Sequence, residues 1–167
     1  IAADPSIDFV IVCTPPNARQ RIVDVLAAAG KPILMEKPIE RTLEAAERIV
    51  TTCKNASVPL GMVLQHRMRE ASLLLTRLLR EDHFGKPAVA EISVLWWRPQ
   101  SYYDEPGRGT LARDGGGVLI SQAIHTMDLA LSLIGPVRTV QAMARTTSLH
   151  QMETEDFVTV GLEFANG

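Results

Sequence analysis

The feature that most constrains the fold is an alternation of short apolar runs with helical stripes over the first 64 residues. The apolar runs lie at 7–14, 32–35 and 59–64, and each has the length of one buried strand. Between them, residues 18–29 and 42–53 place apolar side chains at the spacing of an amphipathic helix. Strands that alternate with helices of this length form βαβ units. We therefore predict a parallel sheet with helices packed against it, which is half of a doubly wound α/β domain.

The pattern changes beyond residue 64. Helical spacing predicts helices at 70–80 and 118–133, and apolar runs predict strands at 88–97, 137–146 and 156–164. The interval between the first of these strands and the second helix holds five glycines among tyrosine, arginine, aspartate and proline residues. A loop of this length in a globular domain is usually functional or disordered. We therefore treat it as a candidate binding segment.

Charge and composition limit the classes of partner. The net charge of −2 over 167 residues includes no block of like charge, so the chain has no electrostatic footprint for nucleic acid or an anionic membrane. No apolar run approaches the ~18 residues of a transmembrane helix, and no signal segment opens the chain. Cys13 and Cys53 have no metal-like or redox-like spacing, so we expect two buried free thiols, which suit a reducing cytoplasm. Both ends of the chain fall inside a structural pattern, and we therefore expect a fragment of a longer protein.

A lysine stands directly after the second predicted strand, in the tripeptide Glu36–Lys37–Pro38. In open parallel sheets, ligands bind beyond the carboxyl ends of the strands, and the other two such ends carry residues 14–17 and 65–67. Partial desolvation at a strand end lowers the pKa of a lysine and suits it to donating a proton. A surface lysine that opens a loop is the alternative interpretation.

A second candidate site lies on the helix predicted after the glycines at 115–117. Ser121, His125 and Asp128 are spaced to share one face of that helix, which is otherwise apolar. Such a polar stripe needs partners or a ligand, and histidine is well suited to proton transfer near neutral pH. An interior histidine bonded to Asp128 or to the main chain is the alternative. No metal site is expected, because no Cys, Glu or second His shares a ligand spacing with His125.

Two weaker clusters are candidates for substrate binding. Aromatic and basic residues at the end of the strand predicted at 88–97 and in the candidate loop can line a sugar pocket by stacking and hydrogen bonding, or can form a sheet edge with its covering loop. Arg67 can anchor a substrate or be an exposed residue at a helix start. The residues of the first cluster are Trp96, Trp97, Arg98, Tyr102, Tyr103 and Arg108.

Together these motifs resemble the Gfo/Idh/MocA oxidoreductase family. The resemblance is carried, in the family's order, by residues 13–17, 28–31, 36–38, 85–86 and 115–128. It implies that residues 1–64 are the C-terminal half of a Rossmann domain that binds NAD or NADP. It also implies that 65–167 are the first part of an α+β substrate and oligomerisation domain with a mostly antiparallel open sheet. Homo-oligomers are expected to form through that sheet.

The resemblance also implies roles for individual residues. Lys37 matches the lysine that contacts both the substrate hydroxyl and the cofactor, in a Lys–Pro pair that is usually cis. His125 matches the histidine that exchanges the hydroxyl proton, and Ser121 stands where many relatives have an aspartate, as a third catalytic candidate. The cofactor candidates are Thr14, Pro15, Asn17, Glu36, Lys37 and Pro38. The substrate candidates are Lys37, Arg67, Trp97, Arg98, Tyr103, Arg108 and His125.

The parent protein is therefore expected to be an enzyme that transfers a hydride between NAD or NADP and a carbinol carbon of a sugar, cyclitol or similar polyol. The dinucleotide fingerprint Gly-x-Gly-x-x-Gly is absent from the 167 residues. The fragment alone is for this reason expected to be inactive. The alternatives are a non-catalytic member that senses a nucleotide or a sugar, and a fragment that acts only as an assembly module.

Overall fold

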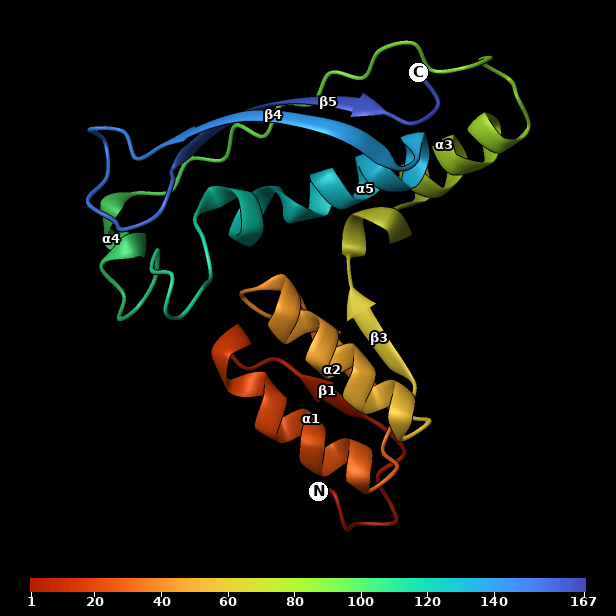
Figure 1. The fold of residues 1–167 in the computed structure, drawn as a ribbon, viewed down its shortest axis with the longest axis vertical. Helices are drawn as coiled ribbons and strands as arrows, with labels where there is room; N and C mark the ends of the chain where they lie inside the picture. Colours follow the sequence, from red (N-terminus) through yellow and green to blue (C-terminus); the bar gives the residue numbers. More distant parts are fainter.

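The first half of the chain is a three-stranded parallel sheet with two helices. The computed structural model describes residues 1–167. Strands β1 (Val10–Val12), β2 (Ile33–Glu36) and β3 (Leu60–Val63) lie in the order β1–β2–β3, and α1 (Arg19–Ala28) and α2 (Leu43–Asn55) connect them (Figure 1). A short 3-10 turn, η1 (Pro16–Ala18), precedes α1. The five predicted elements and the parallel pairing are confirmed, although β1 and β3 are shorter than their apolar runs and β2 is shifted by one residue from its run.

The core of this half lies between the sheet and the two helices. Val12, Ile33 and Met35 point from the strands toward Val23 of α1 and Ile49 of α2, and all five are 3% exposed or less. Burial of such side chains is the main favourable contribution to folding, at roughly 1.5–3 kcal/mol for each. The core therefore fixes the strand ends, where the site candidates lie.

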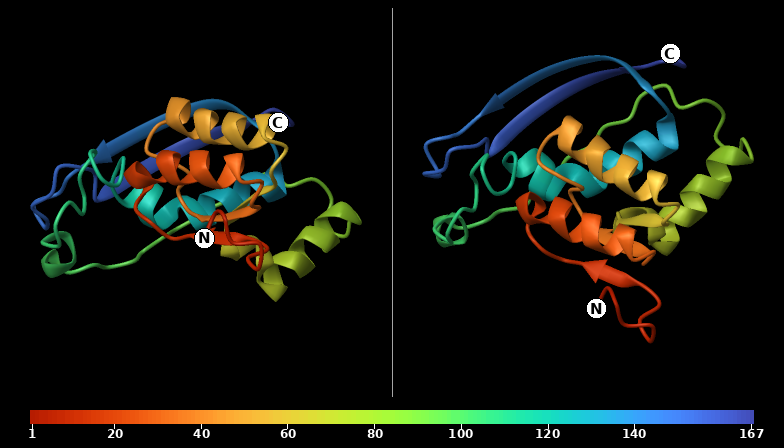
Figure 2. Two further views of the ribbon diagram at one scale, coloured as in Figure 1. Left: turned by 90° about the horizontal axis from the view of Figure 1, so that it is seen from below. Right: turned by 60° about the horizontal axis from the view of Figure 1, so that its bottom comes forward.

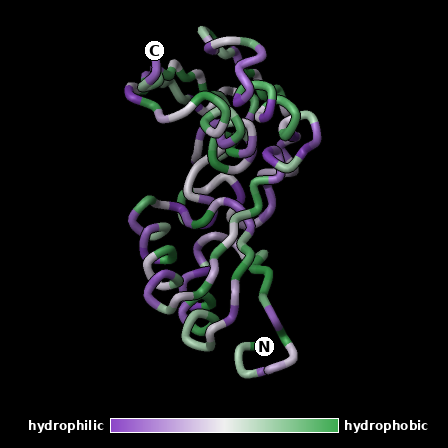
Figure 3. Tube along the Cα trace, turned by 90° about the vertical axis from the view of Figure 1, so that its right-hand side faces the viewer, coloured by the Kyte–Doolittle hydropathy of each residue, from purple (hydrophilic) through white to green (hydrophobic).

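The other face of the same sheet carries no helix. Figure 2 shows α1 and α2 on the same side of β1 in both views. Because alternate residues of a strand point to opposite faces, Phe9, Ile11 and Cys13 lie on the open face, and Phe9 and Ile11 are 55% and 54% exposed. Figure 3 shows this segment as a hydrophobic stretch at the side of the lower half. The prediction of a buried thiol is therefore wrong for Cys13 and confirmed for Cys53.

The second half consists of helices beneath a curved antiparallel hairpin. Strands β4 (Val137–Arg145) and β5 (Phe157–Phe164) pair along their lengths and arch over α5 (Ile124–Ile134), with α3 (Glu70–Arg80) beside it (Figure 1). The side chains of β5 alternate between half-buried and exposed, as expected for a sheet packed on one face. The remaining elements are the 3-10 turn η2 (Gln65–Met68), the short helix α4 (Gln100–Tyr103) and the π-helical turn η3 (Leu119–Ala123).

Two predicted elements differ in the structure. Residues 88–97 are extended but belong to no strand, and Val89 and Leu95 are 89% and 90% exposed. An extended segment becomes a strand only when a neighbouring strand binds its N–H and C=O groups, and β4 and β5 pair with each other instead. The helix predicted at 118–133 is present, but its first turn is the π-helical η3, which shifts the phase of the side chains that follow. No helix in the structure has both the length and the apolarity needed to cross a membrane.

Candidate functional site

Lys37 lies where the two halves meet. It follows β2 directly, and its Nζ donates a hydrogen bond to the main-chain oxygen of Ser121 at 2.5 Å. The Lys37–Pro38 peptide bond is cis, as the resemblance implied. Burial lowers the pKa of Lys37, the carboxylate of Glu36 opposes that shift, and the positive charge of Arg19 adds to it. The lysine is thus a partly desolvated cation at the junction between the Rossmann half and the helix of the second half.

Arg19 is a residue that the sequence reasoning missed. Its side chain is buried, and the guanidinium donates to the carbonyl oxygen of Thr14 through Nε at 2.9 Å and Nη2 at 2.7 Å. Nη1 donates to the carbonyl oxygens of Glu36 and Pro38, on either side of Lys37. The signal was present in the sequence, because Arg19 occupies a core-facing position of α1 with Val23 and Leu26 at i+4 and i+7. A charged residue at an apolar helix position needs buried partners.

His125 lies on α5, with its ring buried. Its Nε2 is 3.3 Å from Nε2 of Gln65, its Nδ1 is buried without a hydrogen-bond partner, and its ring lies 5.2 Å from that of His66. Burial lowers the pKa of His125, and the positive charge of Lys37 and the neighbouring His66 lower it further. The neutral imidazole is therefore favoured, and a neutral imidazole can accept a proton. Gln65 and His66 were noticed at the third strand end but were not among the predicted site residues.

The two residues predicted to share a face with His125 lie in other contacts. The hydroxyl of Ser121 donates to the carbonyl oxygen of Gly117 at 2.6 Å, so Ser121 meets Lys37 through its main chain. The carboxylate of Asp128 accepts two hydrogen bonds from the guanidinium of Arg67 and does not contact His125. This ion pair joins η2 to α5, which is a different environment from the substrate contact predicted for Arg67.

The glycines before η3 allow two close approaches. The carboxylate of Glu155 accepts hydrogen bonds from the N–H groups of Gly117 and Leu119, at 2.9 and 3.1 Å. A Cβ on Gly117 would lie 1.8 Å from the carbonyl oxygen of Glu155, and a Cβ on Gly115 would lie 2.6 Å from the Cα of Arg41. The first approach anchors the start of the helix that carries His125. The second brings the main chain of the candidate loop into close contact with the Rossmann half.

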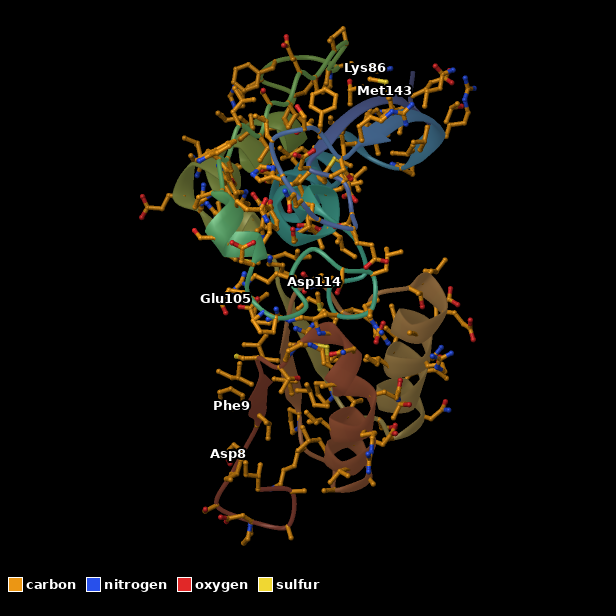
Figure 4. All side chains as sticks on the ribbon, turned by 90° about the vertical axis from the view of Figure 1, so that its left-hand side faces the viewer. Asp8, Phe9, Lys86, Glu105, Asp114 and Met143 are labelled. Atoms are coloured by element: carbon orange, nitrogen blue, oxygen red, sulfur yellow. The ribbon has the colours of Figure 1, made fainter.

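Further contacts hold the loop at this junction. The carbonyl oxygen of Ala112 accepts from Arg41 Nη1 at 2.6 Å and from Asn17 Nδ2 at 3.4 Å. Asp114 lies between the two halves in Figure 4, and its carboxylate raises the pKa of Lys37. Asn17, a predicted cofactor residue, is therefore part of the contact between halves.

The remaining cofactor candidates surround the same strand ends. Thr14 lies two residues after β1, and its Oγ1 is buried without a partner. Pro15 precedes η1, and Glu36 Oε2 accepts from the N–H of Lys37 at 3.2 Å. The unpartnered Thr14 hydroxyl and His125 Nδ1 are polar atoms of the kind that a nicotinamide nucleotide and an alcohol can satisfy. No group of three His, Cys, Asp or Glu side chains in the structure is arranged to hold a metal ion.

The aromatic and basic candidates gather at α4. Tyr103 is buried, and its hydroxyl accepts a hydrogen bond from Gln122 Nε2 at 3.2 Å. The guanidinium groups of Arg98 and Arg108 lie 5.4 and 4.1 Å from the ring centre of Tyr102. Trp97 is largely exposed and packs against His150 of the β4–β5 connection. These residues are thus connected to η3, two residues before His125, through the Tyr103–Gln122 hydrogen bond.

Comparison with known proteins agrees with this arrangement. Residues 1–63 match the family model for the oxidoreductase family with an NAD-binding Rossmann fold, and residues 73–167 match the model for the GFO/IDH/MocA C-terminal domain. The chain is 28% identical over 166 residues to D-apiose dehydrogenase of Rhizobium rhizogenes, and the match covers 99% of this chain and 46% of that protein.

Two solved structures have a higher sequence identity to this chain than that relative has. The WlbA dehydrogenase of Chromobacterium violaceum, in complex with NADH and UDP-GlcNAcA, is 37% identical with a TM-score of 0.90, and 99% of this chain matches 48% of that one. The WlbA dehydrogenase of Bordetella pertussis, in complex with the same two molecules, is 33% identical with a TM-score of 0.91, over 99% and 48% of the two chains. The chain spans about half the length of the relatives it matches.

The predicted fold class is thereby confirmed for both halves: the first is part of an NAD-binding Rossmann domain, and the second is part of a domain with an antiparallel sheet. The motifs that carry the resemblance, between residues 13 and 128, all lie within the two matched ranges. The chain belongs to the GFO/IDH/MocA family of NAD-binding oxidoreductases.

Proposed function

We propose that the complete protein is an NAD- or NADP-dependent dehydrogenase that acts on a carbinol carbon of a sugar, cyclitol or similar polyol. The observation that carries this proposal is the placement of a partly buried lysine, Lys37, against the start of the helix that holds the buried His125, whose pKa is lowered by burial. One group can donate a hydrogen bond to a substrate oxygen while the other accepts its proton. Relatives named as a D-apiose dehydrogenase and as NADH-bound dehydrogenases support a sugar as the substrate.

In the proposed reaction, His125 takes the proton of the substrate hydroxyl and Lys37 stabilises the charge on its oxygen. In the oxidation direction, the C–H bond of the carbinol carbon breaks and its electron pair leaves as a hydride, while the O–H proton passes to His125 and a C=O bond forms. The Lys37 ammonium donates a hydrogen bond to the substrate oxygen and stabilises negative charge that develops on it. Ser121 contributes its main-chain carbonyl, which orients Lys37, rather than a hydroxyl that relays the proton.

The cofactor, when bound, supplies the nicotinamide that takes up or gives back the hydride. We propose that Thr14, Pro15, Asn17, Glu36, Lys37 and Pro38 hold its nicotinamide and ribose at the strand ends. Because Gly-x-Gly-x-x-Gly is absent from these residues, the 167-residue chain alone is proposed to have no dehydrogenase activity.

We also propose that the second half forms homo-oligomers through its sheet. The face of the β4–β5 hairpin that points away from α5 carries Met143 and Phe157, which are 48% and 46% exposed. The two side chains lie diagonally across the two strands, and adjacent exposed apolar side chains favour burial against another molecule. Light scattering of the complete protein tests this: a Met143→Lys variant that dissociates supports the interface, and a monomeric parent contradicts it.

Turnover by the complete protein tests the catalytic proposal. The absorbance of reduced nicotinamide is followed with NAD or NADP and a panel of sugars and cyclitols, for the parent, for Lys37→Met and for the control Lys86→Met. Lys86 is an exposed lysine far from the strand ends, in the connection after α3. We expect Lys37→Met to lower kcat by roughly 10²–10⁴-fold and Lys86→Met to leave it unchanged. Parent-like turnover by Lys37→Met contradicts the assignment. Cofactor binding without turnover on any substrate indicates the non-catalytic alternative.

A further inference from the structure

Two half-buried arginines of the candidate loop lack the partners that the other half-buried or buried arginines of the structure have. Arg98 and Arg108 are both half-buried, and neither takes part in any of the chain's ion pairs. The side chain of Arg98 donates only to the carbonyl oxygen of its neighbour Trp97, at 3.2 Å. The side chain of Arg108 donates no hydrogen bond, and its Nε is buried without a partner. A buried donor on a charged group is unfavourable unless something binds it.

The other half-buried or buried arginines have the acceptors that Arg98 and Arg108 lack. Arg41 pairs with the carboxylate of Glu40, and Arg113 pairs with that of Asp114. Arg19, which has no carboxylate within ion-pair distance, instead binds main-chain carbonyl oxygens through all three of its nitrogens. Every other half-buried or buried guanidinium in the structure therefore has acceptors. Arg98 and Arg108 are half-buried like Arg41 and Arg113, but Arg98 has a single main-chain acceptor and Arg108 has none.

The two guanidinium groups also share one aromatic ring. Both lie within 6 Å of the ring centre of Tyr102, with Arg108 the closer at 4.1 Å. Stacking on a tyrosine ring stabilises a cation by roughly 0.5–1 kcal/mol at an exposed site, but it leaves the N–H groups at the edge of each guanidinium free. Two like charges beside one ring repel each other, and an anion that binds both removes the repulsion.

From these contacts we infer that Arg98 and Arg108, aligned by Tyr102, form a subsite for an anionic group of the substrate, a carboxylate or a phosphate. The planar fork of a guanidinium matches both groups through paired N–H donors. The inference rests on the proposed sugar site and adds to it that the sugar is an acidic or phosphorylated derivative. The D-apiose dehydrogenase relative is named for a neutral sugar, whereas the two WlbA structures hold UDP-GlcNAcA.

The subsite is connected to the proposed reaction centre by short links. Tyr103, next to Tyr102 on α4, accepts a hydrogen bond from Gln122 of η3. The preceding residue, Ser121, accepts the hydrogen bond from Lys37. An anionic group held at Arg98 and Arg108 is thus fixed relative to the helix that carries His125. Binding energy from a distant group can in this way orient the reacting carbon.

Binding of matched ligands to the complete protein tests the inference. Isothermal titration calorimetry in the presence of NADH measures Kd for D-glucose, D-glucuronate and UDP-glucose, which carry no anionic group, a carboxylate and a diphosphate. We expect at least one of the two anionic ligands to bind roughly 10-fold or more tightly than D-glucose, with an affinity that falls as salt is raised. Which of the two binds identifies the carboxylate or the phosphate as the source of the charge.

Three variants assign the effect to the arginines. Arg108→Gln is expected to weaken binding of the anionic ligand by roughly 10- to 100-fold, the loss of a charge-assisted hydrogen bond. Arg108→Lys keeps the charge without the fork and is expected to lie between. Arg80→Gln, which removes an exposed arginine at the end of α3, is expected to bind like the parent. Neutral and anionic ligands that bind equally, or an Arg108→Gln variant with parent-like affinity for the anion, overturn the inference.

The same measurements separate this inference from the proposed reaction. Turnover of neutral sugars without any Arg108-dependent preference for anions leaves the dehydrogenase proposal standing and overturns the subsite. Arg108-dependent binding of an anionic ligand without turnover of any sugar leaves the subsite standing and contradicts the dehydrogenase proposal.

Discussion

Nζ of Lys37 and the main-chain oxygen of Ser121 are joined by a 2.5 Å hydrogen bond that links residues 84 positions apart in the chain. This contact connects the end of a parallel strand to the first turn of the helix that carries His125. It makes the candidate site a property of both halves, because neither half alone holds the lysine and the histidine together.

Arg19 is expected to stabilise the strand ends on either side of Lys37. Replacing it with methionine, Arg19→Met, leaves the buried carbonyl oxygens of Thr14, Glu36 and Pro38 without their donor. We expect the free energy of unfolding of the complete protein, measured by urea denaturation, to fall by about 3 kcal/mol or more. Arg21→Met on the exposed face of the same helix is the control and should change it by less than about 0.5 kcal/mol. Equal effects of the two substitutions contradict the assignment.

The protonation of His125 is expected to depend on Lys37. Because burial, the positive charge of Lys37 and the neighbouring His66 lower the pKa of His125, the neutral ring persists below the ordinary histidine value of about 6.5. Lys37→Met removes the lysine charge and should raise the pKa of His125. NMR titration of the histidine ring nitrogens measures this, with His125→Asn to identify the signal. A pKa of His125 that is unchanged or lower in Lys37→Met shows that the two side chains are not electrostatically coupled.

Oxidation by the complete enzyme is expected to weaken in acid. His125 must be neutral to accept the hydroxyl proton, so the rate should fall as pH falls through its lowered pKa. The measurement is kcat/KM for the oxidation direction against pH. A rate that stays constant through this range, in a protein whose His125 titrates by NMR, excludes His125 as the proton acceptor.

His150 is expected to make stability depend on pH at the far end of the hairpin. Its Nδ1 lies 2.7 Å from Asp156 Oδ2, its Nε2 lies 2.8 Å from the carbonyl oxygen of Arg98, and its side chain is 7% exposed. The Asp156 hydrogen bond raises the pKa of His150, so the charged form is stabilised by folding. This contribution is complete below the unfolded value of about 6.5 and is lost as pH rises through the raised pKa. Thermal unfolding of the complete protein should therefore occur at lower temperature above that pH, and His150→Gln should remove this dependence. The same pH dependence in His150→Gln would assign it to another group.

Gly117 is expected to tolerate no side chain. An added Cβ would overlap the carbonyl oxygen of Glu155, which accepts a hydrogen bond from Val118 at the start of η3. Gly117→Ala should therefore displace the start of the helix and lower both Tm and kcat in the complete protein. Gly161→Ala in β5 is the matched control, since its added Cβ would meet the carbonyl oxygen of Gln141 at an ordinary 3.9 Å. Equal Tm values for the two variants contradict the close approach.

Local sequence patterns determined most of the elements. Helix α3 lies at the residues predicted from its spacing, Thr42 caps α2 by accepting from the N–H of Ala45, and Gly30 adopts a positive φ after α1. These features depend on neighbours within a few positions, and such neighbours are visible in the sequence. The extended segment at 88–97 was predicted as a strand for the same local reason, but a strand also requires a partner that its own sequence does not specify.

The sequence by itself determined the family, the parallel first half, and the choice of Lys37 after a strand and His125 on a helix as site candidates. Only the tertiary structure decided how their neighbours are used. It paired Asp128 with Arg67 and directed the Ser121 hydroxyl to the carbonyl oxygen of Gly117. It also buried Arg19 against the main chain on either side of Lys37 and left Cys13 exposed on the open face of the sheet. The physical reason is that spacing along the chain fixes which face of an element a side chain occupies. Its partner is set by the element packed across from that face, which can be distant in the chain. Gln65 and His125 are 60 positions apart, and Lys37 and Ser121 are 84 positions apart.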